Sequence, residues 1–155
     1  MKRRLAACLL LLAGLAQAEV RPFVAGSLAQ IEQESPGQAF ILSLWSATCT
    51  HCPAELQALG ALARRHPNLR IVLVATDTPA ETAELQRLAA SHGLAGQAQW
   101  VFADAQPERL RYEIDRRWYG ELPRTYFYDR QHRRHGRSGV VPAGELERWV
   151  DEHVK

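Results

Sequence analysis

Two cysteines separated by two residues, in Cys49-Thr50-His51-Cys52, are the side chains of this sequence best suited by type and spacing to chemistry. Cysteines this close can alternate between a dithiol and a disulfide. The apolar run Phe-Ile-Leu-Ser-Leu-Trp ends at Trp45, and helical spacing of apolar residues begins after Cys52. A strand followed by a helix places the first thiol at a helix N-terminus, which stabilises its thiolate form. The motif therefore predicts redox-active thiol chemistry.

A close cysteine pair can also bind metal, and this alternative depends on the other ligands that the chain offers. A zinc site needs four ligands, and the sequence has no second cysteine pair and only scattered histidines. His132 and His135 raise the separate possibility of copper. They lie among arginines in residues 130–137, a pattern more typical of a solvated basic hairpin. We therefore predict no metal and no other cofactor.

The first eighteen residues differ from the rest of the chain. Three cations, Lys2, Arg3 and Arg4, precede an apolar stretch at 5–15 that is too short to span a bilayer. Ala16-Gln17-Ala18 matches a small-x-small cleavage site. The sequence thus predicts a signal peptide at 1–18 and a mature domain at 19–155, with an uncleaved membrane anchor as the alternative. The C-terminus carries no ER-retention signal, which favours export to a bacterial periplasm.

The net charge and the number of cysteines argue against two further classes of protein, nucleic-acid-binding proteins and disulfide-stapled domains. The net charge of +2 for the 155 residues comes from the three leading cations, so the predicted mature chain is nearly neutral. This argues against nucleic-acid binding. Cys8 would leave with the leader, so Cys49 and Cys52 would be the only cysteines of the exported domain. Two cysteines in one short loop do not make a structural disulfide framework.

The elements that must position the motif alternate between strand and helix. Buried apolar runs indicate strands, and residues with helical spacing between capping and stop signals indicate helices. Ser27 is the predicted N-cap of the first helix, and Thr78 caps the helix that begins at Pro79. This pattern predicts one α/β domain with a mixed sheet. The predicted strands are 39–45, 71–75, 100–102, 125–128 and 136–141, and the predicted helices are 28–34, 52–65, 79–92, 107–119 and 144–153.

Two segments resemble the thioredoxin family. Residues 45–52, Trp-Ser-Ala-Thr-Cys-Thr-His-Cys, resemble its active-site strand and turn. Residues 120–127, Gly-Glu-Leu-Pro-Arg-Thr-Tyr-Phe, resemble its cis-proline loop and the next strand. Residues 79–102 resemble the insertion of the exported TlpA/ResA branch. The resemblance covers nearly all of residues 27–154. It implies a thioredoxin-like three-layer sandwich, a central mixed β-sheet flanked by helices, with a TlpA/ResA-type helix–strand insertion.

The resemblance also implies roles for individual residues. Cys49 would be the nucleophile and Cys52 the resolving thiol, an order that agrees with the exposed helix start of Cys49 and the burial expected one turn further on. Pro123 would follow a cis peptide bond and lay the Leu122 backbone against an extended segment of a partner. His51 resembles a residue of the oxidising DsbA loop and is expected to influence the direction of electron flow.

Two charged residues have open roles. In the TlpA/ResA branch a glutamate at the place of Glu55 influences the protons of the thiols, and helical spacing puts Glu55 on the side of Cys52. The alternative is an exposed helix glutamate. Ser43 stands where thioredoxin has a buried aspartate, which adds interest to Glu55 as a carboxylate. Arg124 stands where a small residue is common; it would either lie near Cys49 or point to solvent.

These features predict a periplasmic thiol–disulfide oxidoreductase, most simply a monomeric reductase of the TlpA type. Such proteins receive electrons from a membrane protein and reduce protein substrates, including apocytochrome c and copper-site cysteines. A DsbA-like oxidant is an alternative, although the large helical insertion of DsbA is missing. A Sco-like copper carrier is another, although Sco proteins have three residues between their cysteines where this chain has two.

Overall fold

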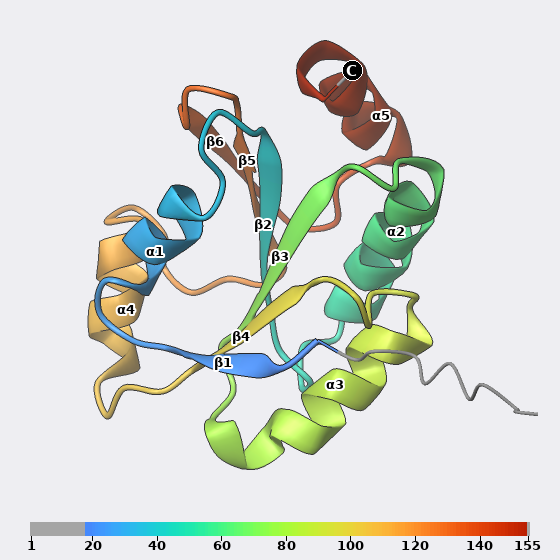
Figure 1. Cartoon of the computed structure of the whole chain (residues 1–155). Helices are drawn as coiled ribbons and strands as arrows, with labels where there is room; N and C mark the ends of the chain where they lie inside the picture. Colours follow the sequence, from blue (N-terminus) through green and yellow to red (C-terminus); the bar gives the residue numbers. More distant parts are fainter. Residues whose placement is uncertain (1–17, 155) are drawn as a thin grey trace, which may run out of the picture.

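The strands form one mixed six-stranded sheet in the computed structural model, which describes residues 18–154 (Figure 1). The strand order is β1-β4-β3-β2-β5-β6. Neighbouring strands from β1 to β2 are parallel, and β5 and β6 continue the sheet in antiparallel pairs. The strands are β1 (Val20–Phe23), β2 (Phe40–Trp45), β3 (Arg70–Ala75), β4 (Ala98–Phe102), β5 (Arg124–Tyr128) and β6 (Arg134–Ser138).

Helices cover both faces of this sheet, as the sequence predicts (Figure 1). One face carries α1 and α4, and the other carries α2, α3 and α5. The helix α3 and the strand β4 form the predicted insertion between β3 and α4. The helices are α1 (Ser27–Gln33), α2 (Cys52–Arg65), α3 (Thr82–Ser91), α4 (Pro107–Ile114) and α5 (Ala143–His153), with a 3-10 turn, η1 (Pro79–Glu81), before α3.

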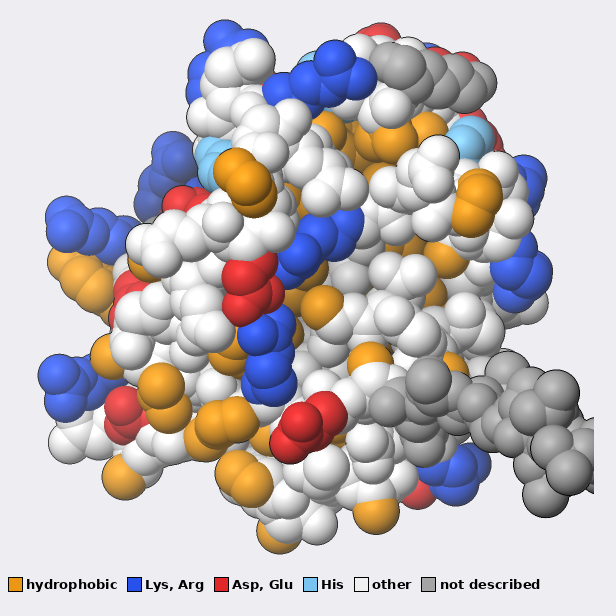
Figure 2. Space-filling model, viewed as in Figure 1, with side chains coloured by type: hydrophobic (Ala, Val, Ile, Leu, Met, Phe, Trp, Pro, Cys, Tyr) orange, Lys and Arg blue, Asp and Glu red, His pale blue; other side chains and the backbone are white. Residues whose placement is uncertain are grey.

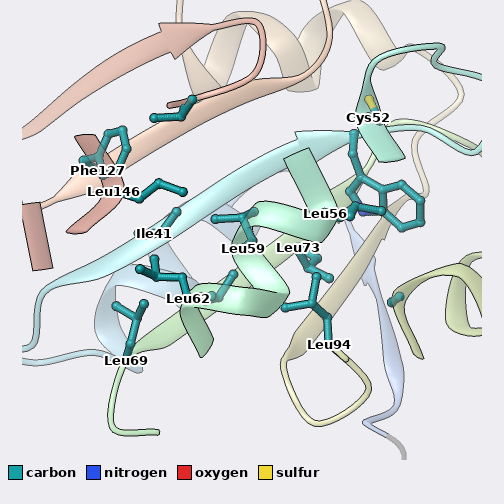
Figure 3. Packing of buried hydrophobic residues seen from close by; sticks show 14 of the residues in the cluster. Ile41, Cys52, Leu56, Leu59, Leu62, Leu69, Leu73, Leu94, Phe127 and Leu146 are labelled. Carbon is teal, nitrogen blue, oxygen red and sulfur yellow. The ribbon is translucent and has the colours of Figure 1, made fainter. Parts of the chain in front are cut away.

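Strand β2 lies in the interior of the sheet and is buried along its whole length. Its side chains alternate between two apolar cores, because successive strand residues point to opposite faces. Ile41 packs with Leu56 and Leu59 of α2, whereas Phe40 and Leu42 belong to the core beneath α1 and α4. Figure 3 shows the first of these cores, in which Cys52 lies near Leu56. The cysteine motif therefore extends from the best-buried strand of the sheet.

The N-terminal part departs from the prediction in two places. Strand β1 was not predicted, because it is short and contains Pro22; it pairs with β4 alone, at an edge of the sheet where proline is tolerated. Ser27 is the first residue of α1 and not its cap. Its hydroxyl accepts a hydrogen bond from the Val24 backbone N–H, and the cap is Gly26, whose φ of 87° favours glycine.

Two predicted elements are too long or shifted. Helix α4 ends at Ile114, not at 119, because Asp115 is extended and its carboxylate accepts hydrogen bonds from the Arg117 N–H and the Tyr126 hydroxyl. Strand β6 covers 134–138, not 136–141, since Gly139 turns the chain with a φ of 79°.

The predicted leader lies outside the described residues except for its last residue, Ala18. No helix within 18–154 is long and apolar enough to span a membrane.

Candidate active site

Cys49 and Cys52 form a disulfide at the start of α2, with their Cα atoms 5.4 Å apart. Cys52 is the first residue of the helix and is fully buried, whereas Cys49 is partly exposed. This difference agrees with the predicted order of reactivity, because an incoming molecule can reach Cys49 but not Cys52. The nucleophilic and resolving roles remain predictions.

The helix start is directed at the sulfur of Cys49. The Cys52 backbone N–H donates a hydrogen bond to Cys49 Sγ over 3.2 Å. His51 occupies the N-cap position without a side-chain hydrogen bond to the helix, and its side chain is exposed. The positive end of α2 therefore meets the sulfur and not a capping oxygen. After reduction, this arrangement favours a thiolate at Cys49.

Glu55 is not an exposed helix residue, so that alternative prediction is wrong. Its side chain is fully buried. One carboxylate oxygen accepts a hydrogen bond from the Thr125 hydroxyl at 2.7 Å, and the other accepts one from the Val141 backbone N–H at 2.8 Å. Burial raises the pKa of Glu55, while the hydrogen bonds from Val141 and Thr125 act in the opposite direction.

Glu55 thereby joins three segments that are distant in the sequence: the first turn of α2, strand β5 just after Pro123, and the loop between β6 and α5. Ser43 lies on the same face of the sheet, directly opposite Thr125 in the antiparallel pair. The Ser43 hydroxyl is buried and has no hydrogen-bond partner within 18–154. A small polar group of side chains thus lies beneath the first turn of α2, where thioredoxin would supply an aspartate.

Thr125 and Val141 were missed by the sequence reasoning. Alternation along β5 assigns Thr125 to the face of α2, which is a usable sequence signal. Nothing in the sequence marks the backbone N–H of Val141, because its partner lies 86 residues away.

The Leu122–Pro123 peptide bond is cis, as the family resemblance implies. Leu44 of β2 pairs with Arg124, so Pro123 lies beside the end of β2 from which the cysteine loop begins. The Pro123 carbonyl accepts a hydrogen bond from the Gly139 N–H, which ties the proline loop to the turn after β6. The contact of this loop with a partner remains a prediction.

Arg124 fills neither of the two roles considered for it. Alternation along β5 places its side chain on the face of α1 and α4, together with Tyr126. Its guanidinium lies 3.3 Å from the Asp115 carboxylate and donates a hydrogen bond to the Ser138 hydroxyl. Only 16% of the side chain is exposed. Arg124 therefore joins the α4–β5 connection to strand β6 and is turned away from the face that carries Cys49.

The basic hairpin is only partly solvated. Strand β6 is largely exposed, but the His132 ring bonds to the Ser35 carbonyl and the Arg134 guanidinium bonds to the Tyr128 hydroxyl. On the face shown in Figure 2, basic and acidic side chains are interspersed. Within residues 18–154, no three His, Cys, Asp or Glu side chains are grouped so that they could hold a metal ion.

Among the comparisons with known proteins, only the search of solved structures finds similar proteins. A scan against protein-family models and a search of curated proteins both give no match. A secreted disulfide oxidoreductase of Mycobacterium tuberculosis, described as homologous to E. coli DsbE, matches with a TM-score of 0.61 and 20% identity over 77% of this chain and 85% of that chain. A thioredoxin-family thiol:disulfide interchange protein of Chlorobium tepidum matches with a TM-score of 0.63 and 12% identity over 80% and 85%. StoA of Bacillus subtilis matches with a TM-score of 0.54 and 18% identity over 74% and 83%. The fold of this chain is thioredoxin-like.

Proposed function

We propose that this thioredoxin-like chain is a protein thiol–disulfide oxidoreductase that works through Cys49 and Cys52. One observation carries the proposal: a redox-capable pair stands at a helix start with one sulfur accessible and facing a backbone N–H, and the other buried. This is the arrangement that activates a nucleophilic thiol and keeps a second thiol for resolution. The chemistry needs no cofactor.

In the reducing direction, the Cys49 thiolate attacks one sulfur of a partner disulfide. The partner disulfide breaks, its second cysteine leaves as a thiolate, and a mixed disulfide forms on Cys49. Cys52 then loses its proton and attacks the Cys49 sulfur, which releases the first partner cysteine as a thiolate. Two electrons pass from the dithiol to the partner, and the Cys49–Cys52 disulfide is restored. Oxidation of a partner is the reverse sequence.

Glu55 is suited to the proton transfer at Cys52. A buried thiol must lose a proton before it can attack, and a buried carboxylate with a raised pKa is a better-matched acceptor than an exposed one. Glu55 lies three residues after Cys52 on the same helix. We assign to it the role of proton acceptor during resolution.

The direction and location of this activity are also proposals. We place the protein in the periplasm after removal of residues 1–18, as a reductase supplied with electrons by a membrane protein. The likeness to a secreted disulfide oxidoreductase supports export. The direction rests on the TlpA/ResA-like insertion, while His51 favours a more oxidising protein. A DsbA-like oxidant is therefore the second candidate.

Equilibration in glutathione buffers, with reduction of insulin as an activity assay, tests the proposal on residues 19–155. We expect reversible conversion between dithiol and disulfide at a potential between roughly −270 and −120 mV, the values of thioredoxin and DsbA. A disulfide that is not reduced by millimolar dithiothreitol, or a reduced protein that does not accelerate insulin reduction, would contradict the proposal.

We propose that His51 raises the potential: its exposed side chain is two residues from Cys49, and a ring N–H donated to the thiolate would stabilise the reduced form. His51→Pro should therefore lower the potential by roughly 30 mV, a tenfold change in the equilibrium constant. Thr50→Ala is the matched control in the same exposed loop and should leave the potential close to that of the wild type. An unchanged or higher potential in His51→Pro would show that the ring does not stabilise the thiolate.

A further inference from the structure

The turn between β2 and Cys49 is bonded to the loop that follows β3. The β2–β3 pairing continues one step beyond the sheet, where the Thr76 N–H donates to the Trp45 carbonyl at 2.9 Å. Asp77 comes next. Its carboxylate accepts a hydrogen bond from the Ser46 hydroxyl at 3.0 Å and lies 3.2 and 3.3 Å from the Ala47 N–H. One side chain thus binds two consecutive residues of the turn.

The direction of these hydrogen bonds follows from counting donors. A carboxylate only accepts, so the single Ser46 hydroxyl hydrogen is directed to Asp77. The Ser46 oxygen is then left as an acceptor, and it lies 3.1 Å from the Thr48 N–H and 3.0 Å from the Thr48 hydroxyl. The Ser46 carbonyl in turn accepts from the Cys49 N–H at 3.3 Å. Each residue from 46 to 49 is fixed to Asp77 directly or through Ser46.

We propose that Asp77 is a positioning residue for the thiol chemistry: its carboxylate fixes the 46–48 turn and so holds the Cys49 sulfur in line with the N-terminus of α2. The proposal rests on the function proposed above, because it concerns how that nucleophile is presented. Asp77 acts through Ser46 and Ala47, to which its carboxylate is hydrogen-bonded.

Through Asp77, the packed strands of the sheet restrict the motion of the turn that leads to Cys49. Strands β2 and β3 are packed in the interior of the sheet, but the pairing ends at Trp45 and Thr76. Without Asp77, the Ser46 hydroxyl and the Ala47 N–H lose their acceptor, and the turn is held by fewer bonds. The Cys49 sulfur would then lie less often within reach of the Cys52 N–H, which is 3.2 Å away in the disulfide form. The thiolate would be less stabilised and the protein less oxidising.

Charge alone predicts the opposite sign. A negative carboxylate near a thiol opposes thiolate formation, so its removal would make Cys49 more reactive. Asp77→Ala removes both the charge and the acceptor, whereas Asp77→Asn removes the charge and keeps one acceptor oxygen for Ser46 and Ala47. The two variants therefore separate positioning from electrostatics.

The test measures iodoacetamide alkylation of Cys49 in the reduced proteins across pH, together with their potentials in glutathione buffers. We expect Asp77→Ala to react about three- to tenfold more slowly at pH 7, the scale of one lost hydrogen bond, with a more negative potential. Asp77→Asn should stay within about twofold of the wild type. Asp104→Ala is the matched control: Asp104 accepts the Gln106 N–H in the loop after β4, and its loss should change neither value.

Ser46→Ala provides a second approach if Asp77→Ala does not fold. It removes the hydroxyl link and leaves the Ala47 N–H bonded to Asp77, and it should slow alkylation in the same direction. Alkylation of Asp77→Ala at or above the wild-type rate would overturn the proposal, as would an Asp77→Asn protein as slow as Asp77→Ala. Failure of the wild type to cycle in glutathione would instead overturn the proposed function, since the alkylation comparison does not depend on it.

Discussion

Cys49→Ser should abolish thiol–disulfide exchange, lowering the protein-catalysed rate of insulin reduction, measured above the background of dithiothreitol alone, by roughly a thousandfold or more, the scale seen when a catalytic nucleophile is removed. Cys49 is the sulfur that a partner can reach, since Cys52 is fully buried. A serine hydroxyl does not form disulfides, and Cys52 alone lacks access. The rate of insulin reduction with dithiothreitol as electron donor measures this effect.

Cys52→Ser is the matched variant and should behave differently. Its Cys49 still attacks a partner, but the resolving step is missing, so the mixed disulfide accumulates. Non-reducing electrophoresis and mass spectrometry should show a partner attached to Cys49 in Cys52→Ser and none in Cys49→Ser. Trapping of the partner on Cys52 in the Cys49→Ser protein would mean that the two roles are reversed. Equal loss of activity without trapping in either variant would contradict the mixed-disulfide mechanism.

Glu55→Ala should be the most destabilising single change at the site. It leaves the Val141 N–H and the Thr125 hydroxyl without their common acceptor in the interior. An unsatisfied buried donor costs about 1–3 kcal/mol, so we expect a loss of about 2–5 kcal/mol in the free energy of unfolding. Glu55→Gln is the matched control, because its amide oxygen can accept from Val141 and its amide nitrogen can donate to Thr125.

The difference in stability between the wild type and Glu55→Gln should depend on pH, and the pKa shift of Glu55 gives the sign of that dependence. Burial raises the pKa of Glu55 in the folded protein above the ordinary value of 4.5, so the folded state holds its proton to higher pH than the unfolded state does. Wild-type stability associated with Glu55 is therefore complete below the ordinary pKa and is lost as the pH rises through the folded pKa. Glu55→Gln has no such loss.

Urea unfolding of the oxidised proteins at several pH values measures this difference. The stability of Glu55→Gln relative to the wild type should increase as the pH rises from the ordinary pKa of a glutamate and become constant above the folded pKa of Glu55. Thr125→Val keeps Glu55 but removes a hydrogen bond that lowers the pKa of Glu55, so its stability relative to the wild type should change in the opposite direction and decrease as the pH rises. A wild-type advantage over Glu55→Gln that grows with pH would indicate that the carboxylate is stabilised in its charged form, and the proposed proton-acceptor role would fail with it.

Several features of the site are readable in the sequence because they depend on neighbours along the chain. The start of α2 follows from the helical spacing after Cys52, and this local pattern places Cys49 at a helix N-terminus. Strands β2 and β3 are short apolar runs, and such runs also predict buried strands from the sequence alone. The cis bond before Pro123 was predictable only through the family resemblance, since a single X–Pro bond is usually trans.

Other features of the site and the fold depend on contacts between elements that are distant in the sequence. Helical spacing places Glu55 on the side of Cys52, but its complete burial requires β5 and the β6–α5 loop to close over it. Arg124 has two plausible surroundings in sequence, and only the pairing of β5 with its neighbours and the end of α4 at Ile114 give it Asp115 as a partner. Strand β1 carries too few residues to show a period, and pairing with β4 is what makes it a strand.

The sequence by itself thus determined the cysteine pair, the position of Cys49 before the helix and of Cys52 within it, and the alternation of strands and helices. These features follow from residue spacing within one or two turns. Tertiary structure alone decided which distant groups these carboxylates bind. Asp77 reaches Ser46 across 31 residues, and Glu55 reaches Val141 across 86. Such contacts are set by strand order and register, through which the mixed sheet brings the ends of separate segments together, and no local pattern encodes them.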